Sequence, residues 1–156
     1  MKLAEIEDAM LETLKTAPAL NYLRTVETLS ERTFDAARAE FVLVPPAVLS
    51  FFLAGELRSR DLARTTYSYD PRFLLFAVAR NLRGAAEEKL GGPTAGEIGA
   101  YRILHDLKLT LAGQRLTLAS NSFQPVCELA GESLEAFTNE FSVYALELIV
   151  RGTLHV

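Results

Sequence analysis

One stretch of unbroken hydrophobicity constrains the fold more than any other feature. Residues 73–79 read Phe-Leu-Leu-Phe-Ala-Val-Ala, and they are bounded by Arg72 and Arg80. The run is far too short for a membrane-spanning helix, which needs about 20 residues. Its aromatic and β-branched side chains favour a strand that is covered on both faces. We therefore expect this segment at the centre of a sheet.

Because side chains alternate along a strand, the apolar run divides into two sets that point in opposite directions. One face carries Phe73, Leu75, Ala77 and Ala79, and the other carries Leu74, Phe76 and Val78. Helices on both sides of the sheet would cover both sets. Helices on one side only would leave the second set for a neighbouring subunit. Since only two strong helices are predicted, we favour the second arrangement.

Length and composition limit the classes of protein that the chain can belong to. Its 156 residues are 49% hydrophobic and 23% charged, which suits one globular domain over residues 1–156. A net charge of −4 argues against a general nucleic-acid binder, which usually has a strong basic excess. The single Cys127 cannot form an internal disulfide, and the acidic N-terminus does not resemble a secretion signal. We expect a cytoplasmic protein.

Apolar residues at three- and four-residue steps predict two principal helices. The first spans residues 1–17, and Pro18 ends it because proline disfavours helical geometry in the residue before it. The second begins at the capping box formed by Thr94 and Glu97 and stops at Gly113.

Shorter apolar or alternating segments predict the strands. These are residues 21–29, 47–53, 62–69, 72–80, 115–119, 123–129 and 141–156. A short helix is predicted over 33–40, Gly55 is expected to break the second strand, and 56–61 are expected to form a charged loop. Asp70-Pro71 allows either a tight hairpin turn or one long bent strand. The resulting fold is α+β: a mainly antiparallel sheet with two principal helices packed on one face.

Residues that could perform catalysis are few and scattered. A hydrolase triad needs a nucleophile, a base and an orienting group, but the only histidines are His105 and His155 and no nucleophile elbow is present. One cysteine and two distant histidines give no zinc-ligand spacing. We interpret His105 as a surface or boundary residue of a helix and Cys127 as a packing residue. The sequence thus predicts no enzyme, cofactor or metal site.

Arginines make the one suggestive charge pattern. Arg58, Arg60 and Arg64 surround one loop, and Arg80 and Arg83 flank the exit of the central strand. They could simply solvate the strand ends. Alternatively, they could contact an acidic patch on a neighbouring subunit or nucleic acid in a channel, where arginines repeated around a ring would sum to a strong field.

Several segments, taken together, resemble a known family. Tyr-Leu-Arg-Thr-Val-Glu (22–27) follows the first helix, Ala-Arg-Asn-Leu-Arg-Gly (79–84) precedes Gly-Glu-Ile-Gly-Ala-Tyr (96–101), and Phe-Ser-Val-Tyr-Ala-Leu-Glu occupies 141–147. This combination resembles the small Mu-like phage and prophage proteins of the head–tail gene block, encoded just upstream of the tail sheath and tube genes. The resemblance covers nearly the whole chain. It departs from the expected continuous strand at Asp70-Pro71.

The resemblance implies a structural protein of the phage tail. Its gene position is similar to that of tail terminators, small α+β proteins that form a hexameric ring on the finished tail. By that analogy the chain would form a homo-oligomeric ring that caps the tail tube and contacts tube, sheath and head-connector proteins. DNA would be passing cargo only, and no membrane contact is expected. The ring would assemble in the host cytoplasm and remain in the tail or neck of the virion.

Candidate interface residues follow from the arginine pattern and the terminal strand. They are Arg58, Arg60, Arg80, Asn81, Arg83, Tyr144 and Arg151. The long strand 141–156, whose tail is expected to leave the protein surface or to reach a neighbour, could join subunits by strand addition.

Two other functions stay open. Within the phage family, a head–tail stopper or adaptor fits the same features. Outside it, a small-molecule or regulatory binding module could use a pocket between the second helix and the sheet.

Overall fold

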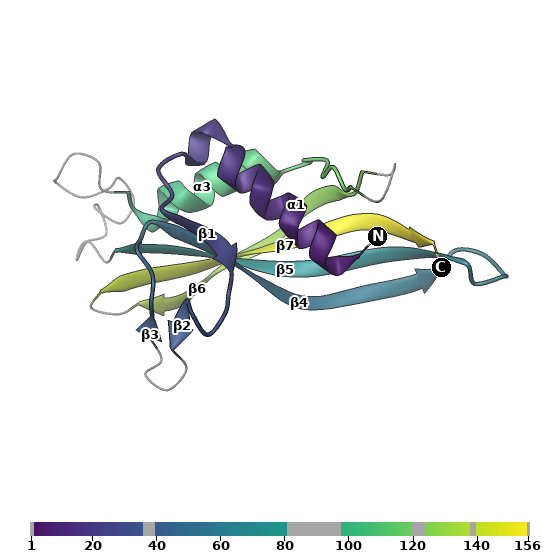
Figure 1. The fold of residues 1–156 in the computed structure, drawn as a ribbon, viewed down its shortest axis with the longest axis horizontal. Helices are drawn as coiled ribbons and strands as arrows, with labels where there is room; N and C mark the ends of the chain where they lie inside the picture. Colours follow the sequence, from purple (N-terminus) through teal and green to yellow (C-terminus); the bar gives the residue numbers. More distant parts are fainter. Residues whose placement is uncertain (1, 36–39, 81–97, 120–123, 138–139, 156) are drawn as a thin grey trace.

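The computed structural model describes residues 2–35, 40–80, 98–119, 124–137 and 140–155 (Figure 1). In chain order these form α1 (Leu3–Thr16), the 3-10 helix η1 (Pro18–Leu20), β1 (Thr25–Thr28), β2 (Phe34–Asp35), β3 (Glu40–Phe41), β4 (Ala47–Ser59), β5 (Thr66–Arg80), α3 (Ala100–Leu111), β6 (Val126–Phe137) and β7 (Phe141–His155).

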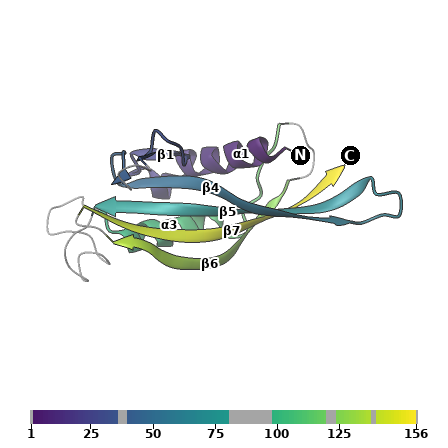
Figure 2. The same ribbon diagram turned by 90° about the horizontal axis from the view of Figure 1, so that it is seen from below.

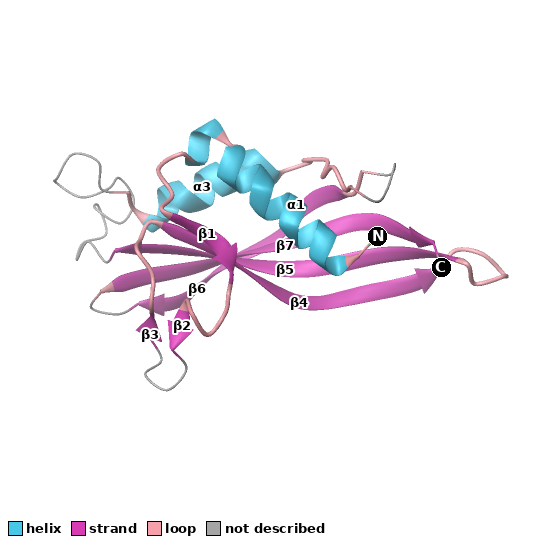
Figure 3. Ribbon diagram, viewed as in Figure 1, coloured by secondary structure: helices cyan, strands magenta, loops and turns pink. Residues whose placement is uncertain are grey.

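Five of the strands make one mixed sheet in the order β1-β4-β5-β7-β6 (Figure 3). β1 runs parallel to β4, and all the other neighbours are antiparallel. The strands β2 and β3 form a separate two-stranded hairpin. β5 is the middle strand of the sheet, which confirms the central position predicted for the apolar run. The α+β class is confirmed as well.

The hydrophobic core lies between the sheet and the two principal helices, which share one face of it (Figure 1). Residues from both helices and from β5 are fully buried in one cluster: Ile6, Met10, Leu14, Ile103, Leu107, Leu111, Phe73, Leu75 and Ala77. The predicted helix-facing set of β5 is therefore correct. α1 ends at Thr16, shortly before Pro18, and Gly113 follows α3 in the left-handed region at φ 71°.

Three strands project beyond the helices as an arm (Figure 2). We call residues 55–69 and 151–155 the β-arm: it comprises the second half of β4, the connecting loop, the start of β5 and the end of β7. β1 pairs with β4 only as far as Ser50 of β4. β6 pairs with β7 only as far as Arg151 of β7. Beyond those points the arm is a three-stranded ribbon, with β5 between β4 and β7.

The β-arm corrects three predictions about the middle of the chain. Gly55 does not break β4, residues 56–59 are strand rather than loop, and β5 starts at Thr66 rather than at residue 62. Of the two alternatives at Asp70-Pro71, the single long strand is the one observed. Gly55 lies opposite Pro71, and β5 stays in register with β4 through this point. Glycine therefore sits where a neighbouring side chain comes close: a Cβ there would lie 3.0 Å from Cε2 of Tyr69.

Pro71 interrupts the pairing of β5 on one side only, the side that faces β7. Partners on β7 are present up to Tyr69, which lies opposite Gly152, and again from Arg72, which lies opposite Ile149. Asp70 and Pro71 have no partner in that register, since proline has no N–H to donate. Pairing with β4 continues and keeps the strand extended.

Other segments also differ from the predictions. The helix predicted at 33–40 is replaced by β2 and β3, whose Phe34 lies opposite Phe41. α3 begins at Ala100, with the preceding Ile98 and Gly99 not helical, whereas the predicted capping box lies outside the described residues. The strand predicted at 115–119 contributes one isolated bridge, from Arg115 to Val126. β6 continues to Phe137, well past the predicted end.

The face of β5 opposite the helices is only partly covered within the chain. Val78 is fully buried in a small cluster with Ala47 and Val143, so the expectation that this face needs another subunit is wrong at that position. Leu74 and Phe76 are half-buried. The uncovered part of this face thus lies in the middle of the strand.

Candidate functional site

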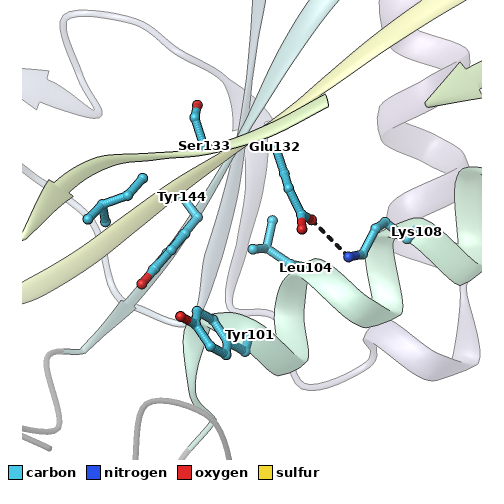
Figure 4. Close-up of a pocket in the computed structure, with 7 residues that line it drawn as sticks. Tyr101, Leu104, Lys108, Glu132, Ser133 and Tyr144 are labelled. Atoms are coloured by element: carbon cyan, nitrogen blue, oxygen red, sulfur yellow. Dashed lines mark hydrogen bonds and ion pairs between the residues drawn. The ribbon is translucent and has the colours of Figure 1, made fainter. Parts of the chain in front are cut away.

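A pocket opens between α3 and the last two strands of the sheet (Figure 4). Its volume is about 320 Å³, and its lining residues are Tyr101, Leu104, Lys108, Glu132, Ser133, Leu134 and Tyr144. α3 supplies one wall because Tyr101, Leu104 and Lys108 recur at three- and four-residue steps along one side of it. β6 and β7 supply the other wall. A pocket between the second helix and the sheet was predicted for a binding module, and it is present.

The pocket is apolar at one end and charged at the other. The Tyr101 and Tyr144 rings meet edge to face with centroids 5.3 Å apart, and Leu134 beside them is 56% exposed. At the charged end, Lys108 Nζ donates to Glu132 Oε2 at 2.8 Å (Figure 4). This ion pair is largely exposed, so it contributes little stability, but it fixes the end of the pocket.

The loop at the end of the β-arm has a defined shape and an exposed apolar residue. Asp61 accepts hydrogen bonds from the backbone N–H of Thr65 at 2.9 Å and from its hydroxyl at 2.6 Å. The hydroxyl of Thr65 is the main reason that the pKa of Asp61 lies below its ordinary value. Arg64 has a positive φ of 55°, which reverses the chain. Leu62, held between these groups, is completely exposed.

The predicted interface residues do not converge on one site. Arg58 and Arg60 lie on the β-arm, Arg80 lies exposed at the other end of β5, and Tyr144 lines the pocket. Asn81 and Arg83 lie outside the described residues. Their role in an interface stays a prediction.

Arg151 is already paired within the chain. Its Nε donates to Glu128 Oε2 at 2.8 Å and its Nη1 to Asp70 Oδ2 at 3.0 Å, so it joins β5, β6 and β7 at the base of the β-arm. The hydrogen bond from Arg151 lowers the pKa of Glu128. The same two carboxylates raise the pKa of Arg151. Its geometry makes it a brace for the β-arm.

A second brace lies on the sheet face opposite the helices. Arg72 is within ion-pair distance of Glu147 Oε1, at 3.3 Å, and of Glu56 Oε1, at 3.6 Å. These carboxylates come from the two strands that flank β5. Together with Arg151, Arg72 ties the three strands of the arm together where the helices no longer support them.

Tyr22 closes the gap between α3 and the segment before β1. Its hydroxyl donates to Asp106 Oδ2 at 2.9 Å, and the Arg102 guanidinium lies 5.4 Å from the centre of its ring. Burial, followed by the bond to Asp106, raises the pKa of Tyr22 well above its ordinary value. The phenol therefore stays protonated and serves as a fixed donor.

Groups suited to catalysis are not assembled in the described part of the chain. His105 is an exposed residue of α3, as interpreted from the sequence. Cys127 is 1% exposed, and burial raises the pKa of its thiol to about 12, which disfavours the nucleophilic thiolate. Among the described residues, no group of three His, Cys, Asp or Glu is placed to hold a metal ion. Within the same residues, none of the helices combines the length and apolar character needed to cross a membrane.

Comparison with known families decides the relationship that the sequence suggested. The profile of the family described as "Bacteriophage Mu, Gp37" matches residues 2–151. The chain belongs to this Mu Gp37 family. It is thus a Mu-like phage protein, and this membership indicates a role in the structure or assembly of the phage particle. No curated protein matches the chain in a sequence search.

Two features of this Gp37-family protein differ from what its sequence predicts. Alternation predicts a strand at Leu62, but this residue lies in the Asp-Leu-Ala-Arg-Thr turn, for which Asp61 and Thr65 are the sequence signal. Leu134 was not assigned to any element. Glu128, Glu132 and Glu135 fall at irregular spacings in β6, so the second half of this strand lacks regular alternation and the second wall of the pocket has no clear sequence signal.

Proposed function

We propose that this Mu Gp37-family protein is a tail terminator, a ring-forming component that caps the tail tube and joins it to the head. Family membership supports a structural role in the phage particle. The observation that carries the finer assignment is the β-arm, which extends far beyond the subunit's own helices (Figure 2). An arm of this kind offers contact surface to a neighbouring subunit or to another protein of the particle.

Open sheet edges give further support. Within the part of the chain that the structure describes, β6 is the last strand of the sheet on one side, and β4 has no strand partner on its outer side beyond Ser50. The exposed part of β4 includes Phe51, Leu53 and Leu57, which are 43%, 48% and 56% exposed. Exposed apolar edges usually indicate association with another chain. Head-to-tail contacts between unlike edges generate closed rings.

Light scattering coupled to size exclusion tests the ring directly. The expected mass is six times the 17.2 kDa of one chain, either alone or after addition of tail tube protein. A monomer at high concentration under both conditions would refute the ring. Mass spectrometry of purified virions should also find the protein, because a terminator remains in the finished tail.

A head–tail stopper is the nearest alternative, and electron microscopy of a phage lacking the gene distinguishes the two. Tails of abnormal length, or normal tails that are not attached to heads, support a terminator. Filled heads that lose their DNA support a stopper.

One observation favours a different function, a small-molecule binding module. The pocket beside α3 has a volume of about 320 Å³, at the lower limit of about 300–1,000 Å³ for ligand sites. Native mass spectrometry of the purified protein tests this function, since a resident ligand would appear as an added mass that is lost in Tyr101→Ala.

A further inference from the structure

We propose that two copies of this chain pair through the outer edge of β4 in the β-arm, antiparallel and about a two-fold axis at Leu57. The contact joins two three-stranded arms into one continuous sheet. A two-fold contact is complete once two copies have met, so it gives a dimer and does not extend into a ring. It therefore goes beyond the proposed function and concerns the free protein, before the arm takes part in the particle.

The outer edge of β4 presents backbone groups that no described strand takes up. The N–H of Arg60 donates to the carbonyl of Thr66 at 2.8 Å, so the backbone of Arg60 is turned inward to β5. Hydrogen-bonded pairs alternate along an antiparallel ladder, and the register of β4 with β5 has no shift over residues 54–59. Three residues of this stretch therefore turn their N–H and C=O groups outward: Gly55, Leu57 and Ser59.

Pro71 agrees with this alternation. It lies opposite Gly55, an outward-turned residue, and a pair of this kind needs no N–H from either member. The ladder between β4 and β5 can thus continue through the proline. The missing N–H affects only the β7 side, where the pairing is interrupted.

The position of the axis follows from backbone and charge together. A pair centred on Leu57 sets Leu57 opposite Leu57 and Gly55 opposite Ser59, so outward-turned groups meet throughout. The same pair sets Glu56 opposite Arg58 of the second copy on both sides of the axis. Axes at Glu56 or at Arg58 would also match the backbone groups, but each would set two like charges opposite each other, which is unfavourable. The axis at Leu57 satisfies both conditions.

The charges select the register, and the backbone supplies the attraction. Glu56 and Arg58 already form an ion pair within the chain, with Oε2 and Nη2 2.9 Å apart. Their side chains are 48% and 75% exposed, so this pair can be exchanged for the one across the axis at little cost. Arg72 approaches the other oxygen of Glu56, at 3.6 Å. The gain comes from new hydrogen bonds along an open edge, as in other cases of strand addition.

Apolar side chains along the edge also lose water in this contact. Leu57 is 56% exposed and would lie beside its counterpart, flanked by Tyr69 of β5 in each copy. Beyond the paired strands, the tip loop of one copy extends towards the bulged part of β4 in the other. That brings the completely exposed Leu62 towards Leu53, which is 48% exposed. Burial of these side chains favours association.

Complementary charge variants test the register. Glu56→Arg and Arg58→Glu each set like charges opposite each other on both sides of the axis, so each should weaken its own dimerisation about tenfold or more in analytical ultracentrifugation. Mixed, the two variants should form a heterodimer with about the wild-type affinity. Neither variant has an ion pair between residues 56 and 58 of its own chain, so recovery cannot come from repair of the subunit. A mixture that does not recover would overturn the register.

Disulfide formation tests the axis without a change of charge. Cα atoms of directly opposite, hydrogen-bonded residues are about 5.5 Å apart, within the range that a disulfide spans. Under mild oxidation, Leu57→Cys should therefore form a covalent dimer about tenfold faster or more than Ser59→Cys. Ser59 is a matched control because it is exposed and outward-turned on the same strand, but lies opposite Gly55. Cys127 is buried and stays out of the reaction. Equal rates would overturn the axis.

The outcomes separate this dimer from the ring. Wild-type protein alone should have twice the 17.2 kDa mass of one chain, and a monomer at high concentration would overturn the contact. Rings that form without tube protein and give no disulfide in Leu57→Cys would also overturn the contact and leave the ring standing. A disulfide-linked dimer that never yields rings with tube protein would support the contact and refute the ring.

Discussion

Two neighbouring leucines of β5 offer the sharpest test of how the sheet is covered. Leu75 is fully buried in the main core, in register with Leu146, which is also buried. Leu74 faces the opposite side, is half-buried, and lies opposite Phe51 and Glu147. The substitutions Leu75→Ala and Leu74→Ala remove the same atoms from adjacent positions of one strand. Differences between them report the environment of each face and not the chemistry of the change.

The expected losses differ severalfold. A buried leucine replaced by alanine costs about 2–5 kcal/mol, because transfer and cavity terms add, and we expect about 3 kcal/mol for Leu75→Ala. For Leu74→Ala we expect about 1 kcal/mol, since the side chain is already partly exposed to water and its loss leaves a site open to solvent. For a domain of this size each kcal/mol lowers Tm by about 2–4 °C. The melting temperatures should therefore fall by about 6–12 °C and about 2–4 °C.

Urea unfolding at low protein concentration is the suitable assay. Association would add stability that depends on concentration, so each variant is measured at two or more concentrations. Unchanged m-values show that the difference is one of stability. Equal losses for the two variants would refute the assignment of a buried and a half-exposed face. A loss for Leu74→Ala that grows with concentration would show that a second subunit covers that face.

Three further predictions concern single groups. Gly113→Ala should lower the free energy of unfolding by about 1–2 kcal/mol, because φ is 71° at this position. Gly131→Ala should leave the stability nearly unchanged, since no atom lies within 4 Å of the new Cβ. Urea unfolding compares the two variants. The thiol of Cys127, with its pKa raised to about 12, should not react with iodoacetamide at pH 8 until the protein is unfolded, and fast labelling of the folded protein would contradict its burial. The folded-state pKa of Glu128 is depressed, so its stabilising effect is present above the unfolded pKa and is lost as pH falls through the folded value. The stability advantage of wild type over Glu128→Gln should therefore shrink as pH falls from about 5 to below the unfolded glutamate pKa of about 4.3, and an advantage that does not depend on pH would argue against the Arg151 pairing.

The sequence predicted those elements whose signals are local. α1 is amphipathic and precedes Pro18, Gly113 follows α3, and residues 73–79 are apolar on both faces, so the C-terminal ends of both helices and the central strand were predicted. The errors lie where neighbours in the sheet decide the structure. Gly55 and Pro71 each disfavour a strand alone, but they lie opposite each other, and the small glycine leaves room for Tyr69. No local pattern reveals that pairing.

The candidate surfaces were harder to predict than the fold. The arginines of the β-arm were found by their charge, but their position at the end of an arm depends on the strand continuing through Asp70-Pro71. The pocket combines α3 with β6, and the register of β6 shifts at two places, between Leu129 and Gly131 and between Leu134 and Ala136. Such irregularities obscure the alternation that identifies a strand. A site made by them therefore requires the structure.

The continuity of β5 joins the core of the subunit to the β-arm on which the proposed function rests. One strand contributes the buried core residues at its C-terminal end and the centre of the β-arm at its N-terminal end. A hairpin turn at Asp70-Pro71 would have ended the sheet there and left no arm. Because the strand continues, and because Arg72 and Arg151 tie it to both of its neighbours, the arm is braced against the core. A braced arm holds its tip loop in a fixed position relative to the core of its own subunit. In the proposed ring, an arm of fixed geometry would make the same contact on every subunit, which is what a ring of defined size requires.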